Sequence, residues 1–223
     1  MSGGDPCAAG GVSASRPSGG EAALRTSGVV DAARSRLLDA GLELFGTVGY
    51  EATTIADLCR QAHVSTRDFY RQVGDRISLF LSLFEREVNR NNGRVAAALA
   101  DAPPEVAVRA RIWMDVWLRD MVADPRRYRV LYTEAHGVDD TLERKRRAML
   151  RDVLVFSRRQ AQLCARARGV DLPEEHWEIP AICISGGARE ALQQYMEHTI
   201  DTDDVDAIID AYVRMAVLVL EHW

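Results

Sequence analysis

The stretch TTIADLCRQAHVSTRDFYRQVGDR, residues 53–76, holds two short helical patterns joined by a very short polar turn. Thr54 can cap the first pattern, residues 55–62, because Asp57 follows three positions later in a capping-box arrangement. Ser65 and Asp68 repeat this spacing at the start of the second pattern, residues 66–70. Two short helices with a tight turn between them predict a helix-turn-helix, the motif whose second helix enters the major groove in many DNA-binding proteins.

The apolar spacing is helical on both sides of this stretch. One face of a preceding helix, which ends near residues 46–50, carries Val30, Ala33, Leu37, Leu44 and Phe45. Further helical patterns follow to the end of the sequence, and Pro, Gly and Asp separate them at residues 101–105, 125, 137, 169 and 201–204. No stretch alternates convincingly with strand periodicity. We therefore predict an all-α fold of about nine helices, with a helix-turn-helix domain at residues 28–78 and a larger helical domain at residues 79–223.

Residues 1–27 are rich in Gly, Ser, Ala and Pro and poor in large apolar groups, which predicts a disordered tail. Arg16 and Arg25 leave open a role for it as a weak DNA-contacting arm. The four cysteines are far apart, so a zinc site or a disulfide framework is not expected. Cys59, Cys164 and Cys183 have apolar neighbours that predict buried thiols, and a redox-sensing pair of Cys164 and Cys183 is the alternative.

Charge and composition narrow the function classes. The chain has 28 Lys and Arg against 33 Asp and Glu, a net charge of −5, which argues against coating nucleic acid by bulk charge but allows a local basic patch. There is no apolar run of membrane-spanning length and no signal-peptide pattern, so a cytoplasmic protein that makes no membrane contact is predicted. No catalytic residues, metal ligands or cofactor motif stand out, so an enzyme is not expected.

The helix-turn-helix geometry predicts which residues meet DNA. The start of the second helix would enter the major groove, where Arg67 can offer two donors to O6 and N7 of guanine. Hydroxyl and cationic side chains around it can bind phosphates and set the register. The predicted DNA-binding residues are Thr53, Thr54, Ser65, Thr66, Arg67, Asp68, Tyr70, Arg71 and Arg76. An αα-hairpin that binds no DNA is the alternative.

Residues 37–80, LLDAGLELFGTVGYEATTIADLCRQAHVSTRDFYRQVGDRISLF, resemble the DNA-binding region of the tetracycline-repressor (TetR) family of bacterial regulators. The matching positions are Leu37, Ala40, Leu44, Phe45, Gly49, Tyr50, Thr53, Thr54, Leu58, Ala62, Val64, Ser65, Tyr70, Arg76 and Leu79. The chain departs from the family pattern at His63, where glycine is usual in the turn, and at Val73, where an aromatic residue is usual. Arg67 and Asp68 replace a Gly-Thr pair, so the operator sequence of relatives does not transfer to this chain.

The resemblance implies that the larger domain binds an effector and forms a dimer. An apolar, aromatic cavity is the usual form of a small-molecule site, and its predicted residues are Trp113, Trp117, Met121, Tyr132, His136, Phe156, Trp177 and Cys183. For each of them, simple filling of the core is the alternative. Two adjacent glycines in a helix cost roughly 1 kcal/mol each relative to alanine, and such small residues let another helix approach closely. The predicted dimer interface is Gly186, Gly187, Leu192, Tyr195, Tyr212 and Val219, with packing within one chain as the alternative.

Together these expectations describe a homodimeric, ligand-responsive transcriptional regulator, a repressor that binds a palindromic operator in double-stranded DNA. An apolar or aromatic small-molecule effector would release it. The alternative is a helical carrier or sensor of small molecules whose helix-turn-helix no longer binds DNA. The Arg67-Asp68 pair and a slight acidic excess between Asp31 and Glu87 keep that alternative open.

Overall fold

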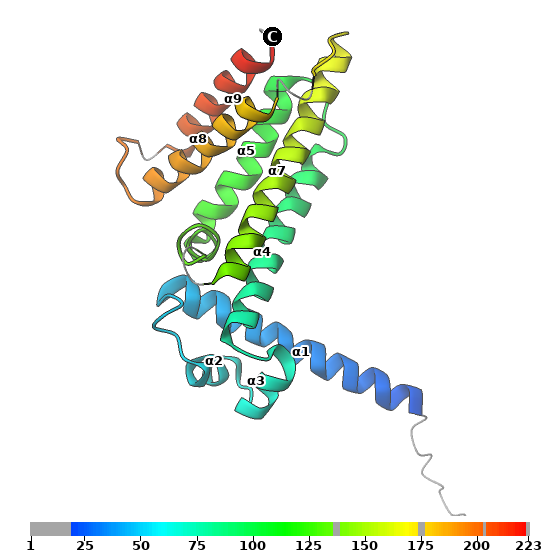
Figure 1. The fold of residues 1–223 in the computed structure, drawn as a ribbon, viewed down its shortest axis with the longest axis vertical. Helices are drawn as coiled ribbons and strands as arrows, with labels where there is room; N and C mark the ends of the chain where they lie inside the picture. The colour runs from blue at the N-terminus through cyan, green and yellow to red at the C-terminus, as the bar shows by residue number, and fades with distance from the viewer. Residues whose placement is uncertain (1–18, 136–138, 174–176, 203, 222–223) are drawn as a thin grey trace, which may run out of the picture.

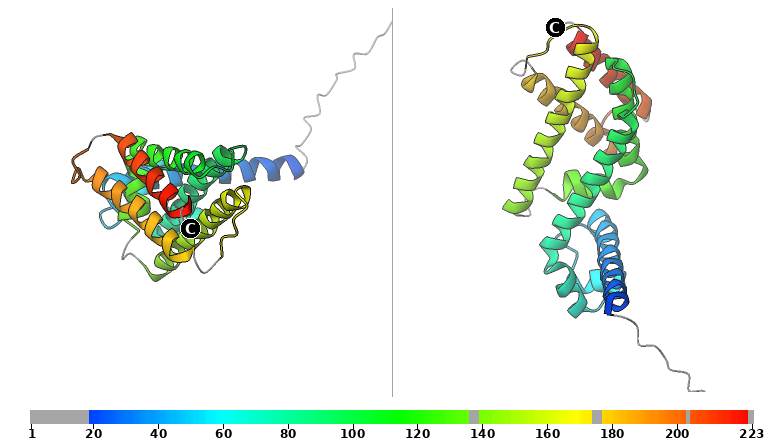
Figure 2. Two further views of the ribbon diagram at one scale, coloured as in Figure 1. Left: turned by 90° about the horizontal axis from the view of Figure 1, so that it is seen from above. Right: turned by 90° about the vertical axis from the view of Figure 1, so that its right-hand side faces the viewer.

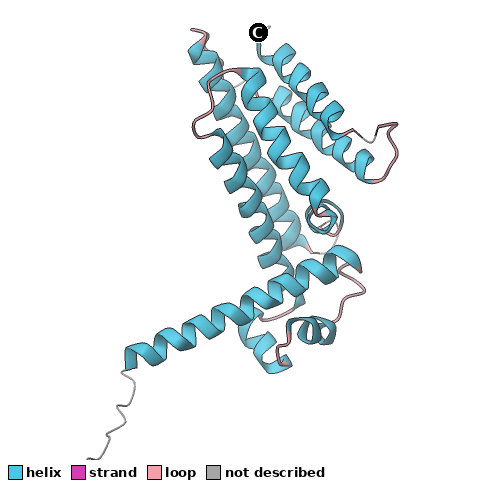
Figure 3. Cartoon of the chain, turned by 180° about the vertical axis from the view of Figure 1, so that it is seen from behind, coloured by secondary structure: helices cyan, strands magenta, loops and turns pink. Residues whose placement is uncertain are grey.

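The computed structural model describes residues 19–135, 139–173, 177–202 and 204–221, and these residues form helices and turns without a strand (Figure 3). The predicted all-α fold is therefore confirmed. The helices are α1 (Gly19–Thr47), α2 (Ile55–Ala62), α3 (Thr66–Val73), α4 (Arg76–Leu99), α5 (Val106–Ala123), α6 (Pro125–Tyr128), a π-helical turn η1 (Arg129–Thr133), α7 (Asp140–Ala167), α8 (Glu178–Met196) and α9 (Val205–Glu221). Helices α1, α2 and α3 lie at one end of the molecule, and the long α4 leads from them into a larger bundle (Figure 1).

Helix α1 starts earlier than the sequence predicts. It begins at Gly19, so residues 19–27 are helical and the predicted disordered tail is wrong for this part; residues 1–18 lie outside the described residues. The segment 21–25, EAALR, consists of strong helix formers, which outweigh the Gly and Ser around them. Figure 1 and the left view in Figure 2 show the first turns of α1 extending away from the other helices.

The predicted caps of the helix-turn-helix are present. The Thr54 hydroxyl accepts the backbone N–H of Asp57 at 3.2 Å, and the Asp57 carboxylate accepts the backbone N–H of Thr54 at 3.2 Å. The Ser65 hydroxyl accepts the N–H of Asp68 at 3.1 Å. The turn between α2 and α3 passes through His63 in the left-handed conformation, at φ 51° and ψ 48°. A histidine therefore occupies a backbone position that ordinarily favours glycine.

Helix α4 runs without a break through the boundary predicted between residues 78 and 79. Its first half belongs to the core of the DNA-binding end, where the ring of Phe80 lies 5.2 Å from that of Phe45 and 5.3 Å from that of Tyr50. Leu79, Phe80, Leu83 and Phe84 are fully buried there. The predicted boundary thus falls within a continuous helix whose first turns complete the core of the helix-turn-helix domain.

The larger bundle is built around α5, which packs along α9 and α4 (Figure 1). Helix α7 packs on α8, and α8 on α9. One helix was expected from residue 126 to 136; the chain instead forms the short α6 and then a π-helical turn. Cys59 and Cys164 are buried as predicted, whereas Cys183 is exposed on α8, which corrects the prediction of a third buried thiol.

None of the helices in the described part of the chain combines the length and apolarity needed to cross a bilayer.

Candidate functional site

The exposed end of α3 presents Thr66, Arg67 and Tyr70 to solvent. Tyr70 is 53% exposed and packs edge-on against the buried ring of Phe69, which orients its hydroxyl outward. The guanidinium of Arg67 makes no hydrogen bond or ion pair with any described residue. A solvated arginine at the start of a helix can offer its donors to a base edge without breaking an internal contact.

The negative charge of Asp68 is compensated within the domain. Its carboxylate accepts the Ser65 hydroxyl at 2.7 Å and pairs with Arg71 at 2.5 Å. Asp57 is held in the same way by Thr54 and by Arg60, and these contacts lower its pKa, the side-chain hydrogen bond from Thr54 most of all. Ser65 therefore caps α3, and the hydrogen bond and ion pair of Asp68 reduce the repulsion that this carboxylate alone would exert on phosphate.

Two residues predicted to bind phosphate lie elsewhere. Thr53 is 1% exposed, and its hydroxyl donates to the carbonyl of Gly49 at 2.7 Å. Arg76 donates to the carbonyl of Thr53 at 2.8 Å and stacks on the ring of Tyr50, with 4.2 Å between the guanidinium carbon and the ring centroid. Both side chains hold the loop before α2 on the core. The burial of Thr53 corrects its assignment to DNA, whereas Arg76 is partly exposed and its assignment stays a prediction.

The larger bundle encloses a cavity of about 480 Å³ between α4, α5, α7 and α8. Four of the predicted effector residues line it, namely Trp113, Trp117, Tyr132 and Phe156. The rings of Trp113 and Phe156 lie 5.0 Å apart, and the indole N–H of Trp117 donates to the hydroxyl of Tyr132 at 3.2 Å. This volume and this apolar, aromatic wall are typical of small-molecule sites.

Three other predicted effector residues do not reach this cavity. Met121 is fully buried in the core, and Cys183 lies exposed on the outer side of α8. Trp177 is buried and lines a separate cavity of about 50 Å³. His136 lies outside the described residues.

Sequence reasoning missed the polar lining of the large cavity. Asn91 on α4 is 6% exposed and lines the cavity together with Asn92, Asp152 and Arg189. The run NRNNGR at residues 89–94 is a detectable signal, because a buried asparagine within an amphipathic helix departs from the apolar face around it.

Large apolar side chains are exposed on α8 and α9, and one of them, Ile182, also borders the large cavity. Ile179 is 66% exposed, Ile182 46% and Leu218 61%, and the exposed Gly187 lies on the same helix as the two isoleucines. Leu192 is instead fully buried in the core. Tyr195, Tyr212 and Val219 pack against buried clusters of their own chain. The predicted interface residues thus divide between the outer face and packing within the chain, and Leu192 is a correction.

The two ends of the molecule meet where α1 lies against α6 and η1. Gly46 allows this approach, because a Cβ there would come within 2.5 Å of the Cβ of Arg126. Arg126 also pairs with Glu43 of α1 at 2.5 Å. The carboxylate of Glu134 accepts the backbone N–H of Tyr50 at 2.8 Å, and Arg129 donates to it at 2.9 Å.

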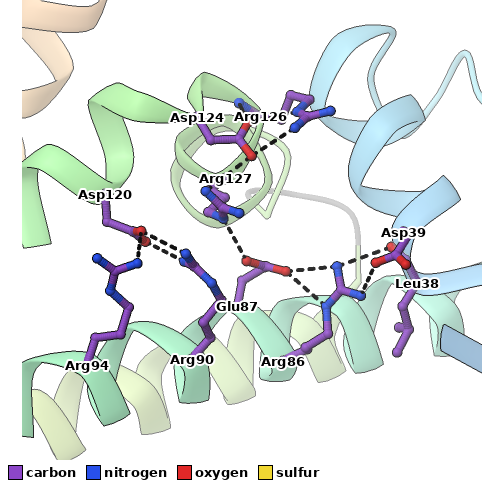
Figure 4. Close-up of polar contacts among 10 residues, drawn as sticks. All are labelled: Leu38, Asp39, Arg86, Glu87, Arg90, Arg94, Asp120, Asp124, Arg126 and Arg127. Carbon is purple, nitrogen blue, oxygen red and sulfur yellow. Dashed lines mark hydrogen bonds and ion pairs between the residues drawn. The ribbon is translucent and has the colours of Figure 1, made fainter. Parts of the chain in front are cut away.

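A buried charge network continues this junction along α4 (Figure 4). The carboxylate of Glu87, 2% exposed, pairs with Arg86 at 2.9 Å and with Arg127 of α6 at 3.2 Å. Arg86 also reaches Asp39 of α1 at 2.7 Å. One turn along α4, Arg90 forms two hydrogen bonds to Asp120, at 2.6 and 2.9 Å. Helices α1, α4, α5 and α6 are thereby joined through charged side chains with defined partners.

Within the described residues, no group of three or more His, Cys, Asp or Glu side chains is placed to hold a metal ion.

Comparison with known proteins agrees with this arrangement. Residues 37–83 match the family model described as bacterial regulatory proteins of the tetR family. A TetR-like transcriptional regulator from Rhodococcus sp. RHA1 superposes with a TM-score of 0.65 at 18% identity, covering 82% of this chain and 93% of its own. The fatty acid degradation regulator FadR from Bacillus halodurans gives 0.71 at 16% identity, with 83% and 94% covered.

FadR from Bacillus subtilis, solved in complex with stearoyl-CoA, gives a TM-score of 0.71 at 14% identity, covering 85% of this chain and 98% of its own. No curated protein matches the chain in sequence. The helix-turn-helix, its match over residues 37–83 and the shared fold agree with one another: residues 37–83 form a DNA-binding domain of the tetR-family type, and the chain has the fold of the TetR-like regulators named here.

Proposed function

We propose that this chain is a homodimeric repressor that binds a palindromic operator and is released from it by a small apolar or aromatic effector. The observation that carries the proposal is the aromatic cavity of about 480 Å³, whose wall includes Val88, Asn91 and Val95 of α4. The same helix supplies Phe80 and Phe84 to the core of the helix-turn-helix domain. A ligand that contacts α4 therefore acts on an element that both ends of the molecule share.

Release follows from differential affinity. A ligand shifts the equilibrium between two arrangements only to the extent that it binds one of them more tightly. The charge network of Glu87 and Asp120 gives α4 defined partners on α1, α5 and α6, so a shift of α4 would exchange a specific set of contacts. The stearoyl-CoA held by FadR from Bacillus subtilis supports an apolar ligand in a fold of this kind.

Dimerisation is proposed through the outer face of α8 and α9, where Ile179, Ile182 and Leu218 are exposed. Isolated apolar side chains are common on surfaces, but three on two packed helices are material for contact with a partner of the same kind. Two recognition helices related by the dimer axis would contact half-sites about one helical turn apart. Replacing Ile179 and Leu218 with Asp should then give a monomer in analytical ultracentrifugation and abolish tight operator binding.

Selection of bound sequences from a random DNA pool, at two salt concentrations, tests the DNA-binding part. A palindrome whose affinity falls steeply with salt supports the proposal, because each phosphate neutralised by Arg releases counterions. Recovery of no motif by the dimer would instead support the alternative, a helical carrier or sensor of small molecules. The operator so obtained then serves to measure release by candidate effectors.

A further inference from the structure

The wall of the large cavity contains a hydrogen-bond donor without an acceptor. Asn91 is more than nine-tenths buried, and its side-chain Nδ2 has no partner among the described residues. A buried amide donor of this kind costs free energy unless something satisfies it. Asn91 lines the cavity although Nδ2 itself is closed to a water-sized probe, so a rotation of the side-chain amide toward the cavity would let a molecule bound there supply the missing acceptor.

A positive charge lies on the same wall. Arg189 of α8 is partly buried, and it makes no hydrogen bond or ion pair with another described residue. Burial raises the pKa of Tyr132 in the cavity, and the hydrogen bond from Trp117 and the nearby charge of Arg189 oppose that rise. The field of Arg189 thus reaches the aromatic part of the site, and a partly desolvated guanidinium attracts a carboxylate more strongly than an exposed one does.

Several other polar groups on the wall are already engaged or open to solvent. The Ser185 hydroxyl donates to the carbonyl of Ala181, and the Tyr132 hydroxyl accepts from Trp117. Asp152 is the one carboxylate among the described lining residues, and it is exposed, so water can solvate its charge. Of the described lining groups, Asn91 therefore has the fully buried donor that lacks a partner, and Arg189 is the one cation.

This inference rests on the proposed function. We propose that the effector is an apolar carboxylic acid. Its aliphatic or aromatic body lies against Trp113 and Phe156, and its carboxylate faces Asn91 and Arg189. The acid supplies in one group the acceptor that Nδ2 lacks and the negative charge that Arg189 lacks. An alcohol of the same skeleton supplies only the acceptor. An amine would place its charge against Arg189 and could pair only with the solvated Asp152.

The test uses the full-length protein and two matched series of probes: decanoate, decanol and decylamine, and naphthylacetate, naphthylethanol and naphthylethylamine. Binding is followed by the fluorescence of Trp113 and Trp117, which line the cavity, and checked by calorimetry. At least one acid should bind about tenfold or more tightly than its alcohol and amine. Equal binding within both series, preference for the amine, or binding of neither acid would overturn the proposal.

Substitutions assign the head group to its residues. Asn91→Leu and Arg189→Gln should each weaken binding of the preferred acid about tenfold, and leave the alcohol within about twofold. Asn89→Leu, an exposed position on α4, and Arg159→Gln, an exposed position on α7, are the matched controls and should leave both affinities unchanged. Asn91→Leu should also raise Tm, because it removes an unsatisfied buried donor; this shows that the variant folds. Unchanged acid affinity in both cavity variants would contradict the assignment.

The failure of this inference and that of the proposed function are distinguishable. If acids bind with the expected selectivity but do not release operator DNA, the ligand class stands and the repressor mechanism fails. If alcohols and acids bind and release DNA equally well, the repressor mechanism stands and the ligand class fails.

Discussion

Arg67 differs from the other arginines of the DNA-binding domain in having no partner among the described residues. Arg60 pairs with Asp57, Arg71 with Asp68, and Arg76 with the backbone of the loop before α2. Each of those guanidinium groups would have to leave a contact in order to reach DNA, whereas Arg67 would not. The neighbours of these four arginines therefore determine which guanidinium group is free to contact DNA.

Arg67→Ala is expected to lower the affinity for the operator by about 1–3 kcal/mol and to relax specificity at one base pair. Thermal stability should not change, because no internal contact is lost. Arg76→Ala should instead lower Tm, because it removes the hydrogen bond to Thr53 and the stacking on Tyr50. Fluorescence anisotropy with a labelled operator and thermal unfolding measure the two effects. Wild-type affinity and specificity in Arg67→Ala would contradict the base-reading role.

The left-handed backbone conformation of His63 affects the stability of the protein. A non-glycine residue in the left-handed region costs about 1–2 kcal/mol, and the turn between α2 and α3 places His63 there at φ 51°. His63→Gly should therefore stabilise the protein by about 1 kcal/mol, while His63→Val should destabilise it because a β-branched residue tolerates this conformation poorly. Urea unfolding compares the three proteins. Equal stability of the Gly and Val variants would show that the turn changes its backbone conformation to suit the residue at position 63.

Residue-scale predictions from the sequence succeed where the partner is local. The caps at Thr54 and Ser65 depend on residues three positions away, so their spacing alone reveals them. Thr53 and Arg76 could not be placed in this way, because the carbonyl of Gly49 and the ring of Tyr50 come close only when the loop folds over the core. A hydroxyl or a guanidinium near a recognition helix has no sequence mark that separates phosphate contacts from internal ones.

At the scale of elements, the contact between α1 and α6 is the closest helix approach that the glycines of the described chain reveal. A Cβ at Gly46 would lie 2.5 Å from the Cβ and 2.8 Å from the Cα of Arg126. A Cβ added at Gly93, in the middle of α4, would meet no atom within 4 Å. The same residue type therefore has opposite roles in two helices: one glycine permits packing, and the other only weakens its helix.

Gly46→Ala should destabilise the protein by about 1–3 kcal/mol, because overpacking forces α6 away from α1. Gly93→Ala is the matched control and should stabilise it by up to about 1 kcal/mol through helix propensity. Chemical unfolding followed by circular dichroism measures both. A stabilised Gly46→Ala variant would mean that α6 moves away from α1 without loss of stability, so that their close packing is not required.

Helix boundaries were predictable to the extent that caps and prolines mark them. Pro125 starts a helix where a break was expected, and Asp75 caps α4 by accepting the N–H of Ser78 at 2.7 Å. The π-helical turn at Arg129–Thr133 has no such mark, because it depends on how the segment packs between α1 and α4. The start of α1 at Gly19 has no clear mark either, because the helix formers at residues 21–25 lie within a Gly- and Ser-rich segment.

At the scale of the whole molecule, the buried charges make stability depend on pH. Burial would raise the pKa of Asp120, but hydrogen bonds from Arg90 and the charges of Arg127 and Arg94 outweigh it, so this pKa lies below the ordinary 3.8. The pKa of Asp124 is also lowered, chiefly by its hydrogen bond from Arg126. A carboxyl whose pKa is lowered by folding stabilises the protein above its unfolded pKa and loses this contribution as pH falls through the folded value.

Stability should therefore decrease as pH falls below about 4. Asp120→Asn should lose about 2 kcal/mol at neutral pH, an estimate reduced because Arg90 and Arg94 are partly exposed, and should depend less on pH in the acid range. Urea unfolding across a pH series checks both expectations. Asp140→Asn, an exposed position at the start of α7, is the control. An unchanged acid slope in Asp120→Asn would contradict the linkage.

The cavity could be foreseen only in part. Trp113 and Trp117 are four positions apart on one face of α5, and this spacing identifies a wall. Met121 continues the same face, yet it ends in the core because α5 passes beyond the cavity there. Which of several apolar side chains borders an empty volume depends on the packing of distant helices, which periodicity does not encode.

The continuity of α4 matters for anyone who wishes to recombine this regulator with relatives. A chimaera joined at residue 78 would exchange Leu79, Phe80, Leu83 and Phe84 for foreign side chains and so rebuild the core beneath the recognition helix. A joint in the turn at residues 101–105, after α4 has ended, leaves that core intact but transfers Asn91 and the α4 wall of the cavity with it. Operator and effector specificity are therefore inherited through a shared helix, and a functional hybrid must match the donor of α4 to both.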